Sequence, residues 1–374
     1  MRYLRYLMNG LQITVAYAYR LLRGRAISVP KTCERVLIVQ TAKLGDMVCS
    51  TPVMHAVRAA FPHARITVLG DALNREVLAG NTDVDEYLVS TDDFFTLLRA
   101  MRQAKFDASI VLVPDSRALA LSFLSGTRLV VAPEVVDGYC PWQTMTYRLL
   151  RRLCVSVPHH MGQYAPREYL HLLEPLGVIA DDTKKHLNYS DAARKNADAF
   201  LRAHDLIEKN FVIIAPSAGN KIKNWPADRF ARVAEYLVTK GLAVIVIGGP
   251  RDREEVSAMM RAVAVPKSII DAGEQFSIDE LKALIAQAAL FVSTDTGPLY
   301  IAEAFDVPTI DILGPMDERE QPPRGEKHRV VIAPRGAPAI HIMNARVYDA
   351  REARRQVEAI TVEMVIEAIN QILL

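Results

Sequence analysis

The stretch VLIVQTAKLGDMVCSTPVMHAVRAAFP, residues 36–62, places a buried strand, a short charged turn and a helix one after another. The apolar run 36–39 predicts the strand, and the spacing of apolar residues over 53–60 predicts the helix. Short turns at the carboxyl ends of parallel strands are where open α/β sheets bind their ligands. An aspartate just before a helix can alternatively serve only as its cap. The candidate site residues of this turn are Lys43, Gly45 and Asp46.

The same alternation of short β-branched runs with helix-period segments continues through the chain, which indicates an α/β protein with parallel, doubly wound sheets. It is interrupted once, by residues 133–189, which are rich in Pro, His and Arg. We therefore predict two Rossmann-like domains, 35–189 and 190–374, with a docked terminal helix over 362–374. The runs predicted as strands are 36–39, 66–69, 109–113 and 129–131, then 211–215, 243–247, 268–270, 290–292 and 309–313.

The composition predicts a folded protein with one unusual segment at its start. A chain of 374 residues that is 50% hydrophobic can bury two cores, and a net charge of +2 does not indicate nucleic acid as a partner. Residues 1–34 carry six basic residues and four tyrosines, the composition of a segment that lies on an anionic membrane surface. Their apolar stretch is too short and too interrupted to cross a bilayer.

We therefore expect a cytoplasmic protein, attached peripherally to the inner face of the cytoplasmic membrane through residues 1–34. Two alternatives stay open for this segment, a solvated helix that packs on the first domain and a cleaved signal. The cysteines are widely separated and lack CxxC spacing, so we expect reduced thiols rather than disulfides or a zinc site. They are Cys33, Cys49, Cys140 and Cys154.

The chain lacks the motifs of common cofactor enzymes. Neither half carries the GxGxxG dinucleotide fingerprint after its first strand, and the Walker A sequence is absent, so we expect no cofactor. The triplet Asp83-Val84-Asp85 has the DxD form of metal-dependent sugar transferases. It directly precedes a predicted strand, however, where aspartates are ordinary turn formers, and we expect no catalytic metal.

Two strand-to-helix turns in the second half suit a phosphate group. In VSTDTGPLYIAEAF, residues 292–305, a capped helix begins near Gly297, and free N–H groups at a helix start bind phosphate. In APSAGNKIKNWPADRF, residues 215–230, two lysines lie among small residues, as a site that neutralises a diphosphate requires. The plainer alternative for residues 292–305 is a capped helix without a ligand, and for residues 215–230 it is a solvated basic loop. The candidates are Ser217, Gly219, Lys221, Lys223, Asp295, Thr296, Gly297, Pro298 and Tyr300.

A basic region lies within the stretch that separates the two halves. It could bind phosphate, or it could be solvated surface. Its members are Arg151, Arg152, His159, His160 and Arg167. We retain Arg151 and His160 as candidate site residues.

Three groups of residues, in this order along the chain, form a combination more specific than any one of them. They are Lys43-Leu44-Gly45-Asp46 with Ser50-Thr51-Pro52, Lys223-Asn224-Trp225-Pro226, and Asp295-Thr296-Gly297-Pro298 followed by Gly314-Pro315. Together they resemble glycosyltransferase family 9, the ADP-heptose:lipopolysaccharide heptosyltransferases. The resemblance extends from about residue 35 to residue 374 and leaves residues 1–34 outside it.

The resemblance implies a GT-B architecture, in which two Rossmann-like domains face a cleft. It also implies inverting, metal-independent transfer of a sugar from a nucleotide-diphosphate donor to an acceptor. Residues 35–189 are then the acceptor-binding domain, with Asp46 as the general base. The residues expected near the acceptor are Lys43, Gly45, Arg151 and His160. Residues 190–374 are the nucleotide-sugar-binding domain, with Lys223 neutralising the leaving diphosphate. The implied diphosphate-binding turn is Asp295, Thr296 and Gly297.

Two positions differ from the family pattern. Many relatives carry Arg where this chain has Lys43, and heptosyltransferases carry His where it has Tyr300. ADP-heptose is the expected donor, and the expected acceptor is a lipid-linked glycan, either an inner-core lipopolysaccharide, another glycolipid or an undecaprenyl-linked glycan. Two other functions stay open: a nucleotide-sugar epimerase or hydrolase with the same architecture, and a catalytically silent glycan-binding protein.

Overall fold

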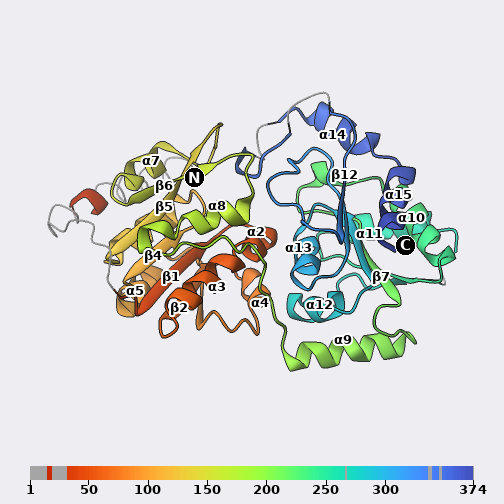
Figure 1. The fold of residues 1–374 in the computed structure, drawn as a ribbon, viewed down its shortest axis with the longest axis horizontal. Coiled ribbons are helices and arrows are strands. Elements are labelled where there is room, and N and C mark those ends of the chain that lie inside the picture. Colours follow the sequence, from red (N-terminus) through yellow and green to blue (C-terminus); the bar gives the residue numbers. More distant parts are fainter. Residues whose placement is uncertain (1–14, 19–31, 266–267, 336–338, 345–347, 374) are drawn as a thin grey trace. The chain divides into compact units, whose positions relative to one another are not determined.

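The chain folds into two compact units, each built around one parallel sheet (Figure 1). The computed structural model describes residues 15–18, 32–265, 268–335, 339–344 and 348–373. Unit 1 comprises the described residues up to Arg75 together with Asn81–His186, and unit 2 comprises Glu76–Gly80 and Leu187–Leu374. The division at residue 186 lies close to the boundary expected after residue 189. The transfer of Glu76–Gly80 to unit 2 has no counterpart in the sequence pattern.

The sheet of unit 1 has six parallel strands in the order β3-β2-β1-β4-β5-β6, as expected for a doubly wound fold. Four strands coincide with predicted runs, β3 is the strand expected directly after Asp83-Val84-Asp85, and β6 was not predicted. Both β3 and β6 lie at the edges and are partly exposed, and β6 lacks a continuous apolar run. The strands are β1 (Arg35–Gln40), β2 (Arg65–Gly70), β3 (Glu86–Val89), β4 (Ala108–Val111), β5 (Leu129–Val136) and β6 (Val155–His160).

Helices cover both faces of this sheet. On one face, α5 (Phe94–Ala104), α6 (Ser116–Leu124) and α7 (Met145–Arg151) bury their apolar stripes against β1, β4 and β5. On the other, α2 (Leu44–Cys49), α3 (Thr51–Ala60) and α8 (Ala165–His171) pack together (Figure 1). The short helix α4 (Asn74–Val77) follows β2.

The sheet of unit 2 also has six parallel strands, in the order β12-β11-β10-β7-β8-β9. All five predicted runs are strands, and the additional strand β12 is a partly exposed edge strand. The mixture of charged and apolar residues in β12 explains why it was not predicted. The strands are β7 (Phe211–Ala215), β8 (Ala243–Val246), β9 (Ile269–Asp271), β10 (Leu290–Thr294), β11 (Thr309–Ile312) and β12 (His328–Val331).

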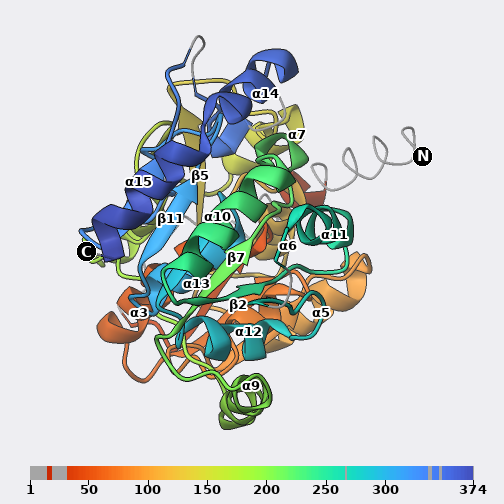
Figure 2. The same cartoon turned by 90° about the vertical axis from the view of Figure 1, so that its right-hand side faces the viewer.

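The helices of unit 2 enclose its sheet in the same way (Figures 1 and 2). One face packs against α10 (Ala227–Thr239), α11 (Arg253–Ala262) and α15 (Val362–Leu373), so the predicted terminal helix is present and docked. The other face carries α12 (Ile278–Ile285) and α13 (Gly297–Ala304), with α9 (Asp191–Ala203) packed on α12. Helix α14 (Ala350–Ala359) precedes α15, and Trp225 donates its indole N–H to the carbonyl of Ile360 between them, at 2.9 Å.

The segment Glu76–Gly80 is held in unit 2 by a buried lysine. Lys282 of α12 is fully buried, and its Nζ donates to the carbonyl oxygens of Val77 at 3.1 Å and Ala79 at 2.9 Å. Asp279 supplies the counter-charge at 3.0 Å. Burial lowers the pKa of the Lys282 ammonium, and the hydrogen bond from Lys282 to Asp279 opposes that shift.

The predicted membrane-surface segment lies largely outside the described residues. Residues 15–18 are helical, with Ala16 buried in the core of unit 1 and the Tyr17 hydroxyl donating to the carbonyl of Leu149 at 3.0 Å. This short piece therefore packs on the unit. No helix in the described part of the chain is long and apolar enough to span a bilayer. The four cysteines are buried free thiols, as predicted, and burial raises the pKa of the Cys33 thiol to about 11.

Candidate functional site

The turn after β1 presents Asp46 in the first turn of α2. Lys43 is the residue just before the helix, and its backbone N–H donates to the Asp46 carboxylate at 3.1 Å. The capping contact expected of a plain helix start is thus present. The Asp46 side chain is nevertheless half-buried, not enclosed, and Lys43 is exposed. Asp46 can therefore cap α2 and still meet a ligand.

The backbone of this turn is fixed from several sides. The Gln40 side chain accepts from Ala42 N at 3.1 Å, and Thr41 Oγ1 donates to Asp115 at 2.8 Å. The Asn74 amide donates to the carbonyl of Ala42 at 2.9 Å. Because the chain on both sides is anchored, the half-buried Gly45 and the Asp46 carboxylate have a defined position at the carboxyl end of β1.

Three donor-side candidates of unit 2, Lys223, Asp295 and Tyr300, meet directly after β10. Lys223 Nζ lies 2.9 Å from Asp295 Oδ2, and the Tyr300 hydroxyl donates to Oδ1. The lysine side chain is 16% exposed and the aspartate 5%, so this ion pair is nearly buried. Tyr300 is itself buried on α13. Two residues predicted separately, Lys223 and Tyr300, thus hold the same carboxylate.

The first residues of α13 stand next to this pair. Thr296 is the cap residue of the helix but makes no side-chain capping bond, Gly297 begins the helix, and Pro298 occupies its first turn. All three are partly exposed. The backbone N–H groups of a helix start, with a lysine nearby, form a site for a phosphate group.

A further carboxylate, Asp311 of β11, lies beneath this group and was not predicted from the sequence. It is fully buried, pairs in register with Ser293 of β10, and has no hydrogen-bond partner on either oxygen within the described residues. Burial, reinforced by the charge of Asp295, raises the pKa of Asp311 well above the usual carboxylate range. The surroundings of Asp311 therefore favour the protonated form of its carboxyl group. The only sequence signal was one charged residue inside the apolar run TIDIL.

Lys221 contacts different carboxylates from Lys223. Its Nζ lies 2.7 Å from Glu255 and 3.4 Å from Asp252, and it donates to Ser217 Oγ at 3.0 Å. Two carboxylates, one on α11 and one on the residue before it, thus match its charge. Gly219 of the same loop is exposed. Lys223 is therefore the lysine that the structure places beside α13.

The acceptor-side candidates Arg151 and His160 lie apart from Asp46. Arg151 forms a two-point contact with Glu134, and His160 Nδ1 lies 2.6 Å from Asp137. These pairs belong to β5, β6 and α7 at one edge of the sheet, with β4 between them and β1. The hydrogen bond with Asp137 raises the pKa of His160. Arg151 and His160 thus form their own ion pairs and are not assembled with the β1 turn.

The two aspartates of the DxD triplet form ion pairs with different residues. Asp85 pairs with Arg58 at 2.6 Å and accepts from the backbone N–H of Ile66. Asp83 pairs with His55 at 3.1 Å. They therefore do not form a two-carboxylate metal site. Their place in the turn before β3 agrees with the expected turn-forming role.

The motif residue Gly314, which follows β11, is required by backbone geometry. Its φ of +62° is one that glycine adopts without strain, and a Cβ there would lie 2.7 Å from Val357 Cγ2 of α14. The Gly314-Pro315 motif thus serves the packing of α14 on the end of the sheet.

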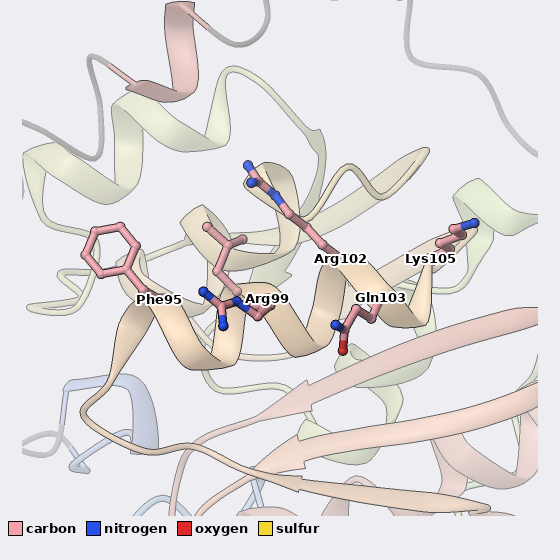
Figure 3. Close-up of a pocket in the computed structure, with 6 residues that line it drawn as sticks. Phe95, Arg99, Arg102, Gln103 and Lys105 are labelled. Carbon is pink, nitrogen blue, oxygen red and sulfur yellow. The ribbon is translucent and has the colours of Figure 1, made fainter.

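Figure 3 shows a shallow depression on α5 that is separate from all these candidates. Its volume is about 430 Å³, and it contains neither a carboxylate nor a predicted site residue. It therefore offers no carboxylate for proton transfer. The lining residues are Phe95, Leu98, Arg99, Arg102, Gln103 and Lys105.

Comparisons with known proteins identify the family. The profile described as glycosyltransferase family 9 (heptosyltransferase) matches residues 95–345, more than half of the chain. Lipopolysaccharide heptosyltransferase 3 of Escherichia coli is 27% identical over 286 residues, which cover 73% of this chain and 81% of that protein. Lipopolysaccharide heptosyltransferase 2 of Escherichia coli K12 is 23% identical over 359 residues, covering 91% and 99%.

Solved structures agree on the fold. The glycosyltransferase family 9 protein of Veillonella parvula superimposes with a TM-score of 0.74 at 23% identity, covering 91% of this chain and 97% of that one. ADP-heptose lipopolysaccharide heptosyltransferase II of Escherichia coli gives a TM-score of 0.71 at 19% identity, covering 91% and 98%. The two Rossmann-like units are thus those of the GT-B architecture, and the chain belongs to glycosyltransferase family 9, the heptosyltransferase family.

Proposed function

We propose that this protein is an inverting glycosyltransferase that moves a heptose from ADP-heptose to the lipopolysaccharide core or another lipid-linked glycan. Family membership supports sugar transfer, and the names of the relatives support this donor and acceptor. The observation that carries the proposal is the nearly buried Lys223–Asp295 pair beside the start of α13.

The proposed donor site uses Lys223 to meet negative charge where it develops. As the bond from the sugar to the diphosphate breaks, charge builds on the phosphate oxygens, and a positioned ammonium stabilises it. Asp295 fixes the lysine, and Tyr300 holds Asp295 in turn. Because burial favours the protonated form of Asp311, this residue adds less negative charge that would oppose diphosphate binding. The partly exposed N–H groups of Thr296 and Gly297 supply further donors.

The proposed acceptor site uses Asp46 as the general base. An acceptor hydroxyl has a pKa far above neutrality, so it must lose its proton as it attacks the anomeric carbon. A carboxylate within hydrogen-bond reach can accept that proton, and a single base suffices because inversion needs no covalent sugar intermediate. Lys43 N–H holds one carboxylate oxygen of Asp46 in place. Lys43 and Gly45 belong to the same anchored turn and are the proposed acceptor contacts.

The proposed transfer needs neither a cofactor nor a catalytic metal, since Lys223 and the start of α13 supply the charge stabilisation. We further propose that the protein acts at the inner face of the cytoplasmic membrane. The basic residues of 1–34 support this, because a lipid-linked acceptor is presented there.

The experiment is a transfer assay in which nucleotide-diphosphate sugars are tested with and without a lipopolysaccharide-core acceptor, each in buffer and in EDTA. We expect ADP-heptose to raise the melting temperature of the protein more than the other nucleotide-diphosphate sugars do. In the transfer assay we expect heptosylated acceptor to form equally in buffer and in EDTA. Formation of an altered or hydrolysed sugar without acceptor would instead establish an epimerase or hydrolase. Loss of transfer in EDTA at a temperature well below melting would contradict the metal-independent chemistry.

A further inference from the structure

A group of metal-ligating side chains lies within unit 1, outside the proposed transfer site. His55 projects from α3, Asp83 lies in the turn before β3, and His186 is the last residue of the unit. Each offers a ligand atom, and these atoms all lie within 4.8 Å of one another. His55 Nδ1 is 3.1 Å from Asp83 Oδ2, and the two imidazole rings stack with centroids 3.9 Å apart. Three segments distant in sequence thus converge on one point.

The backbone around this group is fixed by hydrogen bonds. The N–H of His186 donates to Thr51 Oγ1 at 3.0 Å, and its carbonyl accepts from the Asn81 amide at 2.9 Å. The same Asn81 side chain accepts from the N–H of Asp83 at 2.8 Å. Asn81 therefore positions two of the three ligand residues. A supporting set of this kind is what orients the ligands of a metal ion.

The imidazole of His186 has a buried nitrogen without a partner. Its Nε2 is closed off from solvent and has no hydrogen-bond partner among the residues that the structure describes. A neutral imidazole nitrogen without a proton partner is a ligand for a transition metal. An ordinary His–Asp surface pair would account for His55 and Asp83 but not for His186.

We propose that His55, Asp83 and His186 bind one zinc ion. Two imidazole nitrogens and one carboxylate oxygen are ligands that zinc accepts, with water completing the shell, whereas magnesium and calcium prefer oxygen ligands. The two rings are nearly parallel, at 13°, so an ion in the plane of one lies outside the plane of the other. Binding therefore turns one ring. The His55 side chain, 46% exposed, has room to do so.

We assign this zinc site a structural role, because its three ligands join separate segments of unit 1 and none of them is a residue of the proposed donor site. The ion would join α3, the turn before β3 and the end of the unit's chain. Asp83 serves here with two histidines, while the other carboxylate of the DxD triplet, Asp85, remains paired with Arg58.

The test measures zinc on the purified full-length protein. After stripping with EDTA and dialysis against zinc chloride, we expect one equivalent of zinc by elemental analysis and a higher melting temperature. Cobalt(II) in its place should give the visible absorption of a four- or five-coordinate site. His186→Ala and Asp83→Asn should lose the equivalent, the cobalt band and the thermal shift.

His63→Ala is the matched control, because His63 is an exposed histidine in the turn between α3 and β2. It should keep all three signals. If His186→Ala does not fold, His55→Ala, which alters a half-exposed side chain, gives the same comparison. Absence of a zinc equivalent on the wild type would overturn the proposal. So would full retention of zinc in the ligand variants.

Discussion

Replacing Asp46 with asparagine separates the catalytic role of this residue from its capping role. The amide side chain of the Asp46→Asn variant keeps an oxygen that can accept the N–H of Lys43, which lies 3.1 Å from the carboxylate in the wild type. It cannot take a proton from an acceptor hydroxyl at neutral pH. Loss of a general base costs about 10² to 10⁴ in rate. We therefore expect sugar transfer to fall at least about a hundredfold, the lower limit of that range.

The effect on stability should be much smaller. A negative charge in the first helical turn contributes about 0.3–1 kcal/mol, and the capping hydrogen bond survives in the variant. A domain is stable by about 5–15 kcal/mol, so this loss leaves nearly all molecules folded. Unfolding therefore cannot account for a hundredfold fall in rate. Binding of ADP-heptose should hardly change, because the proposed donor groups lie in unit 2.

The assay combines three measurements on the same protein: melting temperature, the dissociation constant for ADP-heptose, and the single-turnover rate with acceptor. Asp93→Asn is the matched control, since Asp93 caps α5 through the N–H groups of Phe95 and Thr96 but belongs to no candidate site. It should lose similar stability and keep its rate. A near-normal rate for Asp46→Asn would refute the base assignment and leave Asp46 as a cap.

Three further outcomes are expected. Lys223→Ala should reduce the rate of transfer strongly. Lys221→Ala should have a smaller effect, because Asp252 and Glu255 already match the charge of Lys221. Equal losses of rate in the two variants would contradict this distinction. Asp311→Asn should be more stable than the wild type at alkaline pH in urea unfolding. Because the folded pKa of Asp311 is raised, the native state binds the extra proton above the unfolded pKa, so wild-type stability falls as pH rises, by up to about 1.4 kcal/mol per unit. If the free energies of unfolding of Asp311→Asn and the wild type differed by the same amount from pH 5 to 9, this expectation would be contradicted. Replacing the six basic residues of 1–34 with glutamine should release the protein from anionic vesicles in a flotation assay without loss of its cooperative melting, and unchanged flotation would show that another surface binds.

The buried strands were predictable because they are continuous apolar runs, whereas the edge strands β6 and β12 were not predicted. In β6, exposed and buried side chains alternate, and in β12 three of the four residues are only partly buried, so neither contains the signal of a core strand. The stretch 133–189 was interpreted as a boundary region, yet it contains β6, α7 and α8. Pro158, His159 and His160 of this stretch lie in the edge strand β6, where a proline is tolerated.

The local part of the candidate site was predictable, and its long-range contacts were not. The positions of Asp46 and Asp295 follow from strand–turn–helix patterns within a few residues. That Lys223 reaches Asp295 depends on two turns 72 residues apart coming together. The raised pKa of Asp311 depends on its complete burial, and the meeting of Asp83 with His186 depends on the path of the whole unit. No local pattern encodes such distances.

The buried Lys282 has a consequence for how the protein is made. Its two carbonyl acceptors precede it by more than 200 residues, with a separation of 205 positions between Val77 and Lys282. During synthesis Glu76–Gly80 leaves the ribosome early and must wait roughly 10 to 40 s, at the usual rate of elongation, before α12 exists to receive it. The two units therefore cannot mature strictly one after the other. A fragment that begins at residue 187 would contain Lys282 but not the carbonyl groups of Val77 and Ala79 that accept its hydrogen bonds.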